Sequence, residues 1–421
     1  MQFKIESFLN QNLPAGGTRV DVVFSLSAAG GPAAARPGRV IGLLGDRSGS
    51  MAGDKMQALK HAMRVAIDAI DDDTEFFVVA FDTAGKLAMP LTRADASGKR
   101  SGHAGVQRLE AGGGTSLSSA LKAARDVFAK RPGAVCQAIL LTDGQNGPDD
   151  AGPLEAELQA CAGQFQAHCR GVGTDWSPPE LRQIADRLLG TAQMVATPSA
   201  LAEDFRATIA AAMALGVADV RLRLWMPKNA RLTAFKQGYP AEIDLLSSLR
   251  PVDQRAVDLP LGAWSEGTQD YSATFTVVPL ATGEQMLVCR PSIVFPDPAT
   301  RADQSVPGAN VTCTWTDDAS LSTRIDAQVA HYSGQAEKAR AIQEGLEAME
   351  RRDDGTATLR LGRALQLSQQ SGDEEMTRRL RQVVDVVDEA AGTVRLRRGA
   401  EKAAVMDLDI ASTRTVRVKR E

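Results

Sequence analysis

The sequence predicts an α/β unit with a mostly parallel sheet, inserted into an antiparallel β-sandwich and followed by a small helical domain. Three changes of hydrophobic period indicate this order. Short apolar runs alternate with amphipathic stretches across residues 39–215, which is typical of strands joined by crossover helices. Apolar and polar residues alternate singly on both sides of that unit, and a period of three to four residues begins near Leu321.

The length of 421 residues also favours several domains, because single hydrophobic cores stop growing at roughly 250–300 residues. The changes of period give the boundaries. We expect N-terminal sandwich strands at 1–38, the α/β unit at 39–215, the rest of the sandwich at 216–318, the helical domain at 319–392 and a tail at 393–421.

The N-terminal stretch reads as two strands, Gln2–Phe8 and Arg19–Leu26, because apolar and polar residues alternate along both. Strands of the same character return only after Gly216. We therefore expect the N-terminal strands to join the later ones in one sandwich, which makes the α/β unit an insertion.

Within the α/β unit, Val40–Leu44 is apolar almost throughout, as expected of a strand buried on both faces. A helix is expected to begin at Pro178, because proline is tolerated in the first turn of a helix. The strands are expected at 40–44, 76–81, 136–141, 166–171 and 192–196, and the helices at 55–70, 115–129, 154–162, from 178, and at 199–213.

After Gly216 the single alternation lies between Gly and Pro turns, which is typical of an antiparallel all-β unit. Its strands are expected at 217–225, 270–278, 285–295 and 310–316.

The helical domain is expected to begin with one helix from Leu321 to Met349, since apolar residues there recur every three or four positions. Polar and Gly breaks at 352–355 and 370–373 separate two further helices, the last with an apolar face from Met376 to Val387. Beyond Gly392 the chain is basic and rich in small residues, so the tail is expected to be flexible.

The overall composition excludes several classes of partner and site. Lys and Arg number 48 against 52 Asp and Glu, so no net positive charge attracts nucleic acid or an anionic membrane. The five cysteines are scattered without CxxC spacing and are expected to be reduced core thiols. No leader-like start and no apolar stretch of roughly 18 residues occurs, so we expect a cytoplasmic protein.

A candidate cation site begins at Asp46, directly after the apolar strand that ends at Leu44. This is the carboxyl end of a strand, where open α/β sheets bind ligands. Asp46, Ser48 and Ser50 alternate within one loop that contains Gly49, so three oxygen-bearing side chains can turn toward one point.

Two further segments supply oxygens to the same edge. Asp143 follows the apolar strand beside the first, and Thr115 stands at a helix start after three glycines. Two carboxylates and three hydroxyls without His or Cys select Mg²⁺, with Mn²⁺ or Ca²⁺ as alternatives, over zinc or copper. Because Mg²⁺ takes about six oxygens, one position is expected to face outward, where an acidic side chain of a protein partner can bind.

These segments resemble the von Willebrand factor A family. The sequence DRSGSM at 46–51 is similar to the family's Asp-x-Ser-x-Ser motif, Thr115 in GGGTSL to its threonine and TDG at 142–144 to its second aspartate. The resemblance covers 39–215 and implies a six-stranded sheet with flanking helices, an intact metal-ion-dependent adhesion site and a bacterial binding protein. In that family the serines and threonine typically contact the metal, and the aspartates often act through water.

Other interpretations of these residues stay open. Asp46 or Ser50 can instead cap the helix expected near Asp54, although Thr115 and Asp143 in register argue against that. Asp82, just past the next strand, and Gly144 are candidates for a supporting role around the cation. For Asp82 a solvated turn is the favoured alternative.

The sequence argues against an enzyme, since it contains neither GxxxxGK[ST] nor GxSxG. A metal-dependent hydrolase or phosphatase is a weaker alternative, because Ser48 stands where such enzymes usually have a second acid. A regulatory subunit of an AAA+ ATPase complex is the other alternative, by analogy with chelatase-type A domains.

Two tail threonines, Thr413 and Thr415, lie in a basic setting that a Ser/Thr kinase can modify. This tail resembles those of bacterial von Willebrand A proteins in kinase, phosphatase and forkhead-associated-domain systems. An FHA-domain protein and a Ser/Thr kinase are therefore possible partners, and the alternative is a solubilising tail without such a role.

Overall fold

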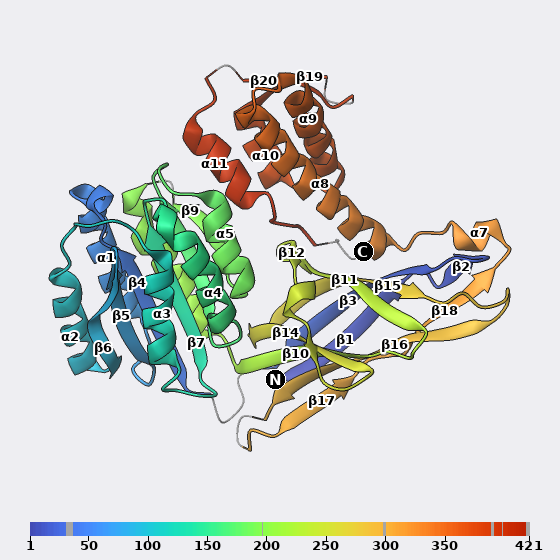
Figure 1. Cartoon of the computed structure of the whole chain (residues 1–421), viewed down its shortest axis with the longest axis horizontal. Helices are drawn as coiled ribbons and strands as arrows, with labels where there is room; N and C mark the ends of the chain where they lie inside the picture. Colours follow the sequence, from blue (N-terminus) through green and yellow to red (C-terminus); the bar gives the residue numbers. More distant parts are fainter. Residues whose placement is uncertain (31–36, 196, 298–299, 389–390, 398, 418–421) are drawn as a thin grey trace. The chain divides into compact units, whose positions relative to one another are not determined.

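The chain forms two compact units in the computed structural model, which describes residues 1–30, 37–195, 197–297, 300–388, 391–397 and 399–417 (Figure 1). One unit consists of Met1–Gly31, Val220–Leu261 and Glu266–Glu421, and the other of Pro32–Asp219 and Gly262–Ser265. The expected fold class is confirmed: a mostly parallel six-stranded sheet with helices, two antiparallel sheets and a C-terminal helical region.

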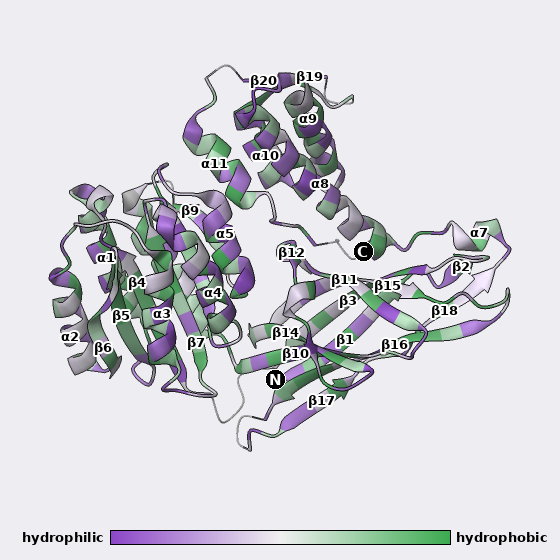
Figure 2. Ribbon diagram, in the orientation of Figure 1, coloured by the Kyte–Doolittle hydropathy of each residue, from purple (hydrophilic) through white to green (hydrophobic). Residues whose placement is uncertain are grey.

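The sheet of the inserted unit has the strand order β6-β5-β4-β7-β8-β9. All neighbouring strands are parallel except β5 and β6 at one edge. The apolar runs of β4 and β5 are visible in Figure 2. The strands are β4 Arg39–Asp46, β5 Glu75–Phe81, β6 Gly85–Arg93, β7 Val135–Thr142, β8 Gln166–Val172 and β9 Ala192–Val195.

Helices cover both faces of this sheet. Phe128 of α3 packs edge-on against Phe77 of β5, with ring centroids 5.0 Å apart. Phe205 of α6 and Leu59 of α1 belong to a separate apolar core that also holds Leu43. The helices are α1 Asp54–Ala69, α2 Ala96–Gln107, α3 Leu117–Phe128, α4 Ala151–Cys161, α5 Pro178–Arg187 and α6 Leu201–Met213.

Strand β6 and helix α2 were not foreseen from the sequence. The helix contains three glycines and little apolar periodicity, so its composition does not predict a helix. Asp95 caps its start by accepting hydrogen bonds from Ser97 and Gly98. Close packing explains the glycines: a Cβ at Gly98 would stand 1.8 Å from the Arg93 carbonyl oxygen.

The N-terminal strands complete the sandwich, as expected. Strand β3 lies between β1 and β15, and Phe24 of β3 lies opposite Tyr271 of β15. The two sheets have the orders β1-β3-β15-β11-β12 and β13-β14-β10-β16-β18-β2, with β17 paired to β16. Their strands are β1 Gln2–Leu9, β2 Asn12–Pro14, β3 Arg19–Ala29, β10 Val217–Trp225, β11 Ala230–Tyr239, β12 Ile243–Asp244, β13 Arg250–Pro251, β14 Ala256–Trp264, β15 Gly267–Val277, β16 Gln285–Pro296, β17 Asp303–Pro307 and β18 Val311–Thr316.

The helical region differs from the expectation at two points. The prediction of a single helix from Leu321 is wrong, because α8 begins at Ala327. The Asp326 carboxylate caps this helix by accepting hydrogen bonds from the backbone amides of its first turn. Val387, expected on the last apolar helix face, lies in a strand and is 66% exposed. The elements are α7 Ala319–Ser322, α8 Ala327–Glu350, α9 Asp354–Gln370, α10 Glu374–Val383, β19 Val384–Asp388, β20 Thr393–Leu396 and α11 Lys402–Ala411.

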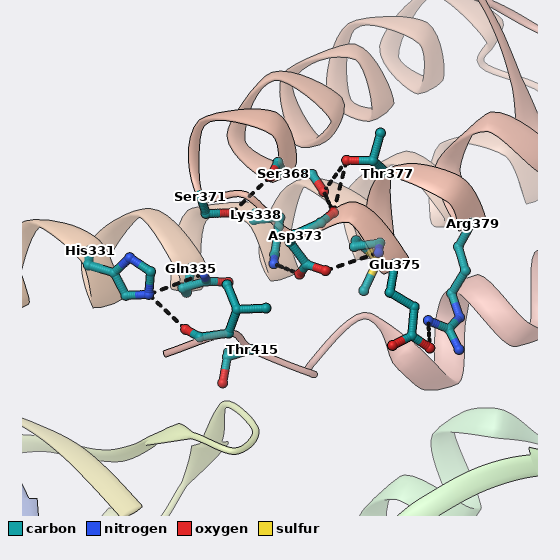
Figure 3. A network of polar contacts seen from close by, with 12 residues as sticks. His331, Gln335, Lys338, Ser368, Ser371, Asp373, Glu375, Thr377, Arg379 and Thr415 are labelled. Carbon is teal, nitrogen blue, oxygen red and sulfur yellow. Dashed lines mark hydrogen bonds and ion pairs between the residues drawn. The ribbon is translucent and has the colours of Figure 1, made fainter. Parts of the chain in front are cut away.

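A buried ion pair ties α8 to the start of α10 (Figure 3). Lys338 Nζ donates to Asp373 Oδ2 at 2.5 Å, and the side chains of the two residues are 1% and 7% exposed. Asp373 also caps α10, since its other carboxylate oxygen accepts from the Met376 amide. Burial lowers the pKa of Lys338, and the charge and hydrogen bond of Asp373 oppose that shift.

Residues 393–397 and 399–417 are not the flexible tail expected from composition. Strand β20 and helix α11 fall within them, and α11 buries Met406, Leu408 and Ile410. Residues 412–417, here called the C-terminal strap, follow α11 and begin with a turn at 412–413. Residues 398 and 418–421 of the expected tail lie outside the described residues.

The C-terminal strap is held by β11, β15 and Glu242, the residue before β12. The Thr413 carbonyl accepts a hydrogen bond from the Glu242 amide at 2.7 Å, and Thr415 Oγ1 donates to the Gly238 carbonyl at 2.6 Å. Arg417 Nε pairs with the buried Asp270 carboxylate at 3.0 Å. Arg417 is therefore paired within the fold, which the sequence-based expectation of a solvated tail overlooked.

Two smaller expectations concern the whole chain. The five cysteines are buried and free, as expected for reduced core thiols. Within the ranges given above, no helix is both long and apolar enough to cross a membrane.

Candidate metal centre

The candidate site lies at the carboxyl ends of β4 and β7, which are parallel neighbours with Leu44 opposite Leu140. This register brings the ends of the two strands together. Asp46 is the last residue of β4, and Asp143 follows directly after β7. Both side chains are completely buried, although the two residues lie at the edge of the sheet where the strands end.

Asp46 organises its own loop. One carboxylate oxygen accepts a hydrogen bond from the Ser48 amide at 2.7 Å, and the other accepts from Thr142 Oγ1 at 2.5 Å. Burial raises the pKa of Asp46, since it disfavours the charged form more than the hydrogen bonds from Thr142 and Ser48 favour it. The nearby charge of Asp143 raises the same pKa further.

The two serines link this loop to β7. Ser48 Oγ lies 3.0 Å from Ser50 Oγ, and Ser50 Oγ donates to Asp143 Oδ1 at 2.7 Å. The Asp-x-Ser-x-Ser spacing therefore places its side chains in a continuous chain of contacts that ends on the second carboxylate.

Thr115 reaches the same point from a third loop. A Cβ built on Gly144 would stand 3.3 Å from Thr115 Oγ1 and 3.5 Å from Ser50 Oγ, so Gly144 leaves room where these hydroxyls approach. The glycine loop before Thr115 is fixed by its backbone, because the Gly49 amide donates to the Gly113 carbonyl at 3.0 Å. The structure thus brings all five sequence-predicted ligands together.

Asp150 holds the Thr115 loop in place and was not foreseen from the sequence. Its carboxylate accepts from Ser116 Oγ at 2.9 Å and from the Ser118 amide at 2.9 Å. The Gly147 amide donates to the Thr115 carbonyl at 2.8 Å. In the sequence, Asp150 stands in a turn-like stretch of polar residues, and no local signal links it to Thr115.

Asp82 is not the solvated turn residue that was the favoured interpretation. It is 7% exposed and forms an ion pair with Arg47, the residue between Asp46 and Ser48. Burial alone would raise the pKa of Asp82, but the hydrogen bond from the Ala84 amide and the charge of Arg47 outweigh it and lower that pKa. Asp82 therefore stabilises, through Arg47, the loop that contains Ser48 and Ser50.

Lys55 is the second residue that sequence reasoning missed. Its Nζ lies 2.5 Å from Asp143 Oδ2, opposite the oxygen that accepts from Ser50. The Lys55 ammonium thus forms an ion pair with the second carboxylate of the cluster. In the sequence, Lys55 reads as an ordinary polar residue of the first turn of a helix.

The donor set fits a hard divalent cation, because every candidate ligand is a hydroxyl or carboxylate oxygen. Across the described residues, no three His, Cys, Asp or Glu side chains gather as a metal-binding group. A cation at this site would therefore depend on the hydroxyls of Ser48, Ser50 and Thr115 as well as on the two aspartates.

Comparisons with known proteins agree with this architecture. The family model described as von Willebrand factor type A domain matches residues 40–194, and the model described as von Willebrand factor type A C-terminal domain matches residues 366–412. A solved structure, "von Willebrand factor type A from Catenulispora acidiphila", is 40% identical, covers 99% of this chain and 97% of its own, and superposes with a TM-score of 0.93. This chain belongs to the von Willebrand factor type A family.

Two further relatives extend the likeness of this von Willebrand A protein. The ArnB paralog VWA2 from Sulfolobus acidocaldarius covers 98% of both chains with a TM-score of 0.62 at 14% identity, which shows a shared fold alone. An uncharacterized protein of Synechocystis, sll0103, is 29% identical over 208 residues. That match covers 48% of each chain, so this chain spans about half of that curated relative.

The match at 366–412 bears on the tail as well. It runs through α11 and ends at Ser412, so a family model includes residues that composition alone marked as flexible.

Proposed function

We propose that this protein is a scaffold that grips a protein partner through a divalent cation held by Asp46, Ser48, Ser50, Thr115 and Asp143. Protein binding is the general role of von Willebrand A domains. The observation that carries the specific proposal is the convergence of five oxygen-bearing side chains from three loops on one edge of the sheet.

Mg²⁺ is the proposed ion, with Mn²⁺ and Ca²⁺ as alternatives that the same oxygens accept. A bound cation supplies an open coordination position for a carboxylate of the partner. The protein's part is orientation: Thr142 holds Asp46, Asp150 holds the Thr115 loop, and Arg47 with Asp82 braces the first loop.

We propose binding rather than catalysis at this site. A hydrolase would need an accessible group to take a proton from the attacking nucleophile. Asp46 and Asp143 are completely buried, and both are engaged in hydrogen bonds within the cluster. These contacts suit fixed ligands better than a proton-transferring base.

The finer proposal of a Ser/Thr kinase and FHA-domain system rests on Thr413 and Thr415. Thr415 is 9% exposed and bonded to Gly238, so its modification would require the C-terminal strap to leave β11. Thr413 is only half-buried and is the more accessible of the two. Mass spectrometry of the protein from its native cell tests whether the two threonines are phosphorylated. If neither threonine carries phosphate under any condition, the kinase and FHA-domain proposal is refuted.

A metal-dependent capture experiment tests the main proposal. Immobilised wild-type protein is expected to retain specific proteins from a lysate of its native cell in Mg²⁺ and to release them in EDTA. Thr115→Ala is expected to lose at least roughly 10-fold of this capture, because one cation ligand is removed. Thr92→Ala, a threonine on β6 of the same unit, is the control and is expected to match wild type. Equal capture by wild type in Mg²⁺ and in EDTA would refute the proposal.

A further inference from the structure

Lys55 places a positive charge beside a cluster of side chains that is expected to bind a cation. It stands in the first turn of α1 and reaches across to Asp143 at the end of β7. Its Nζ and Cε pass 3.8 and 3.9 Å from the position of a Cβ on Gly173, in the loop after β8. The side chain of Lys55 is 29% exposed, whereas that of Asp143 is completely buried.

The charges around the cluster explain this placement. Asp46 and Asp143 are both buried, and without a counter-ion their negative charges would be left next to each other. Arg47 is already paired with Asp82, on the other side of the loop. The ammonium of Lys55 is the cation that compensates Asp143, and leaving a buried carboxylate unpaired is strongly unfavourable.

We propose that Lys55 is a tethered counter-ion that holds Asp143 in the metal-free protein and is displaced when a divalent cation binds. The inference rests on the proposed function, because it requires that the cluster takes a cation. An ammonium on one oxygen of Asp143 and a divalent cation beside the other would repel each other within a few ångströms, where Coulomb interactions are large. The partly exposed Lys55 can move into solvent, whereas the buried ligands cannot.

Competition of this kind has a functional consequence. The ion pair of Lys55 stabilises the metal-free site, and this free energy is lost when the cation enters. The same lysine therefore lowers the affinity of the site for the cation. The concentration of divalent cation at which the protein becomes able to bind its partner is then set partly by Lys55.

Paired variants test the competition by titration calorimetry with Mg²⁺ and with Mn²⁺. Lys55→Gln is expected to bind both ions roughly 10-fold more tightly than wild type, the scale of losing one hydrogen-bonded charge interaction. Its melting temperature without metal is expected to fall. Lys122→Gln removes the same charge from an exposed position on α3 and is expected to leave both quantities unchanged. Equal or weaker binding by Lys55→Gln would overturn the proposal.

Amine labelling measures the displacement itself in the wild-type chain. Acetylation of Lys55, followed by mass spectrometry, is expected to be slow without metal and several-fold faster in saturating Mg²⁺, with Lys122 as the internal reference. A rate for Lys55 that does not change with bound Mg²⁺ would overturn the displacement. If wild type binds neither ion, the proposed metal function fails first, so the two failures are distinguishable.

Discussion

Lys338→Met is expected to lower the free energy of unfolding by about 3–5 kcal/mol, the cost of leaving a buried charge without its partner. The Asp373 carboxylate would keep its burial and its contact with the Met376 amide, but it would lose the ammonium 2.5 Å away. Because this pair joins α8 to α10, the loss should appear when urea unfolding is followed by circular dichroism in the far ultraviolet.

A double variant separates the charge from the packing. Lys338→Met with Asp373→Ser removes both buried charges and keeps a hydroxyl that can cap α10. We expect it to recover at least half of the loss, since replacing a whole buried ion pair is often close to neutral. A Lys338→Met variant within about 1 kcal/mol of wild type would show that the pair contributes little to stability.

The second large effect is expected at the cation site. Asp46→Asn should abolish the rise in melting temperature that saturating Mg²⁺ gives to the wild-type protein, with a loss of affinity of roughly 100-fold or more. The amide keeps an oxygen for the Ser48 amide and can donate to Thr142 Oγ1, so the loop retains its hydrogen bonds. What the variant lacks is the negative charge, which a hard cation requires from its surroundings.

The matched control is Asp126→Asn, an aspartate on α3 that is largely exposed. It removes the same charge from the same unit and should leave the Mg²⁺-induced rise unchanged. Differential scanning fluorimetry with and without EDTA measures both variants. A normal Mg²⁺-induced rise in Asp46→Asn would exclude Asp46 from the site.

Much of the fold was predictable because the inserted unit obeys simple rules of burial. The strands β4 and β7 are apolar along most of their length, since both faces of a central parallel strand are covered. The polar residues that follow them therefore mark the ends of strands in the sequence itself. That is why the sequence alone places Asp46 and Asp143 on one edge of the sheet.

The parts that were missed depend on long-range packing. Helix α2 is held by glycines pressed against the β6 strand, a fit that its own composition does not reveal. The C-terminal strap looks solvated by charge, yet Arg417 finds the buried Asp270 carboxylate far away in the sequence. In each case the partner is fixed by the fold and not by neighbouring residues.

The same distinction separates the proposed ligands of the candidate site from the residues that support them. Asp46, Ser48 and Ser50 share a local motif, whereas Lys55 and Asp150 matter only because of where other loops bring Asp143 and Ser116. Sequence motifs identify residues that could touch a cation. The geometry adds Lys55, which compensates the charge of Asp143, and Asp150, which fixes the loop of Thr115.

Anomalous diffraction from crystals of the wild-type protein grown with Mn²⁺ tests the central claim most directly. We expect one strong Mn²⁺ peak within about 2.5 Å of the hydroxyl oxygens of Ser48, Ser50 and Thr115. We also expect Lys55 Nζ to have moved away from Asp143. A map with no Mn²⁺ peak at these hydroxyls, and Lys55 still on Asp143, would contradict the claim.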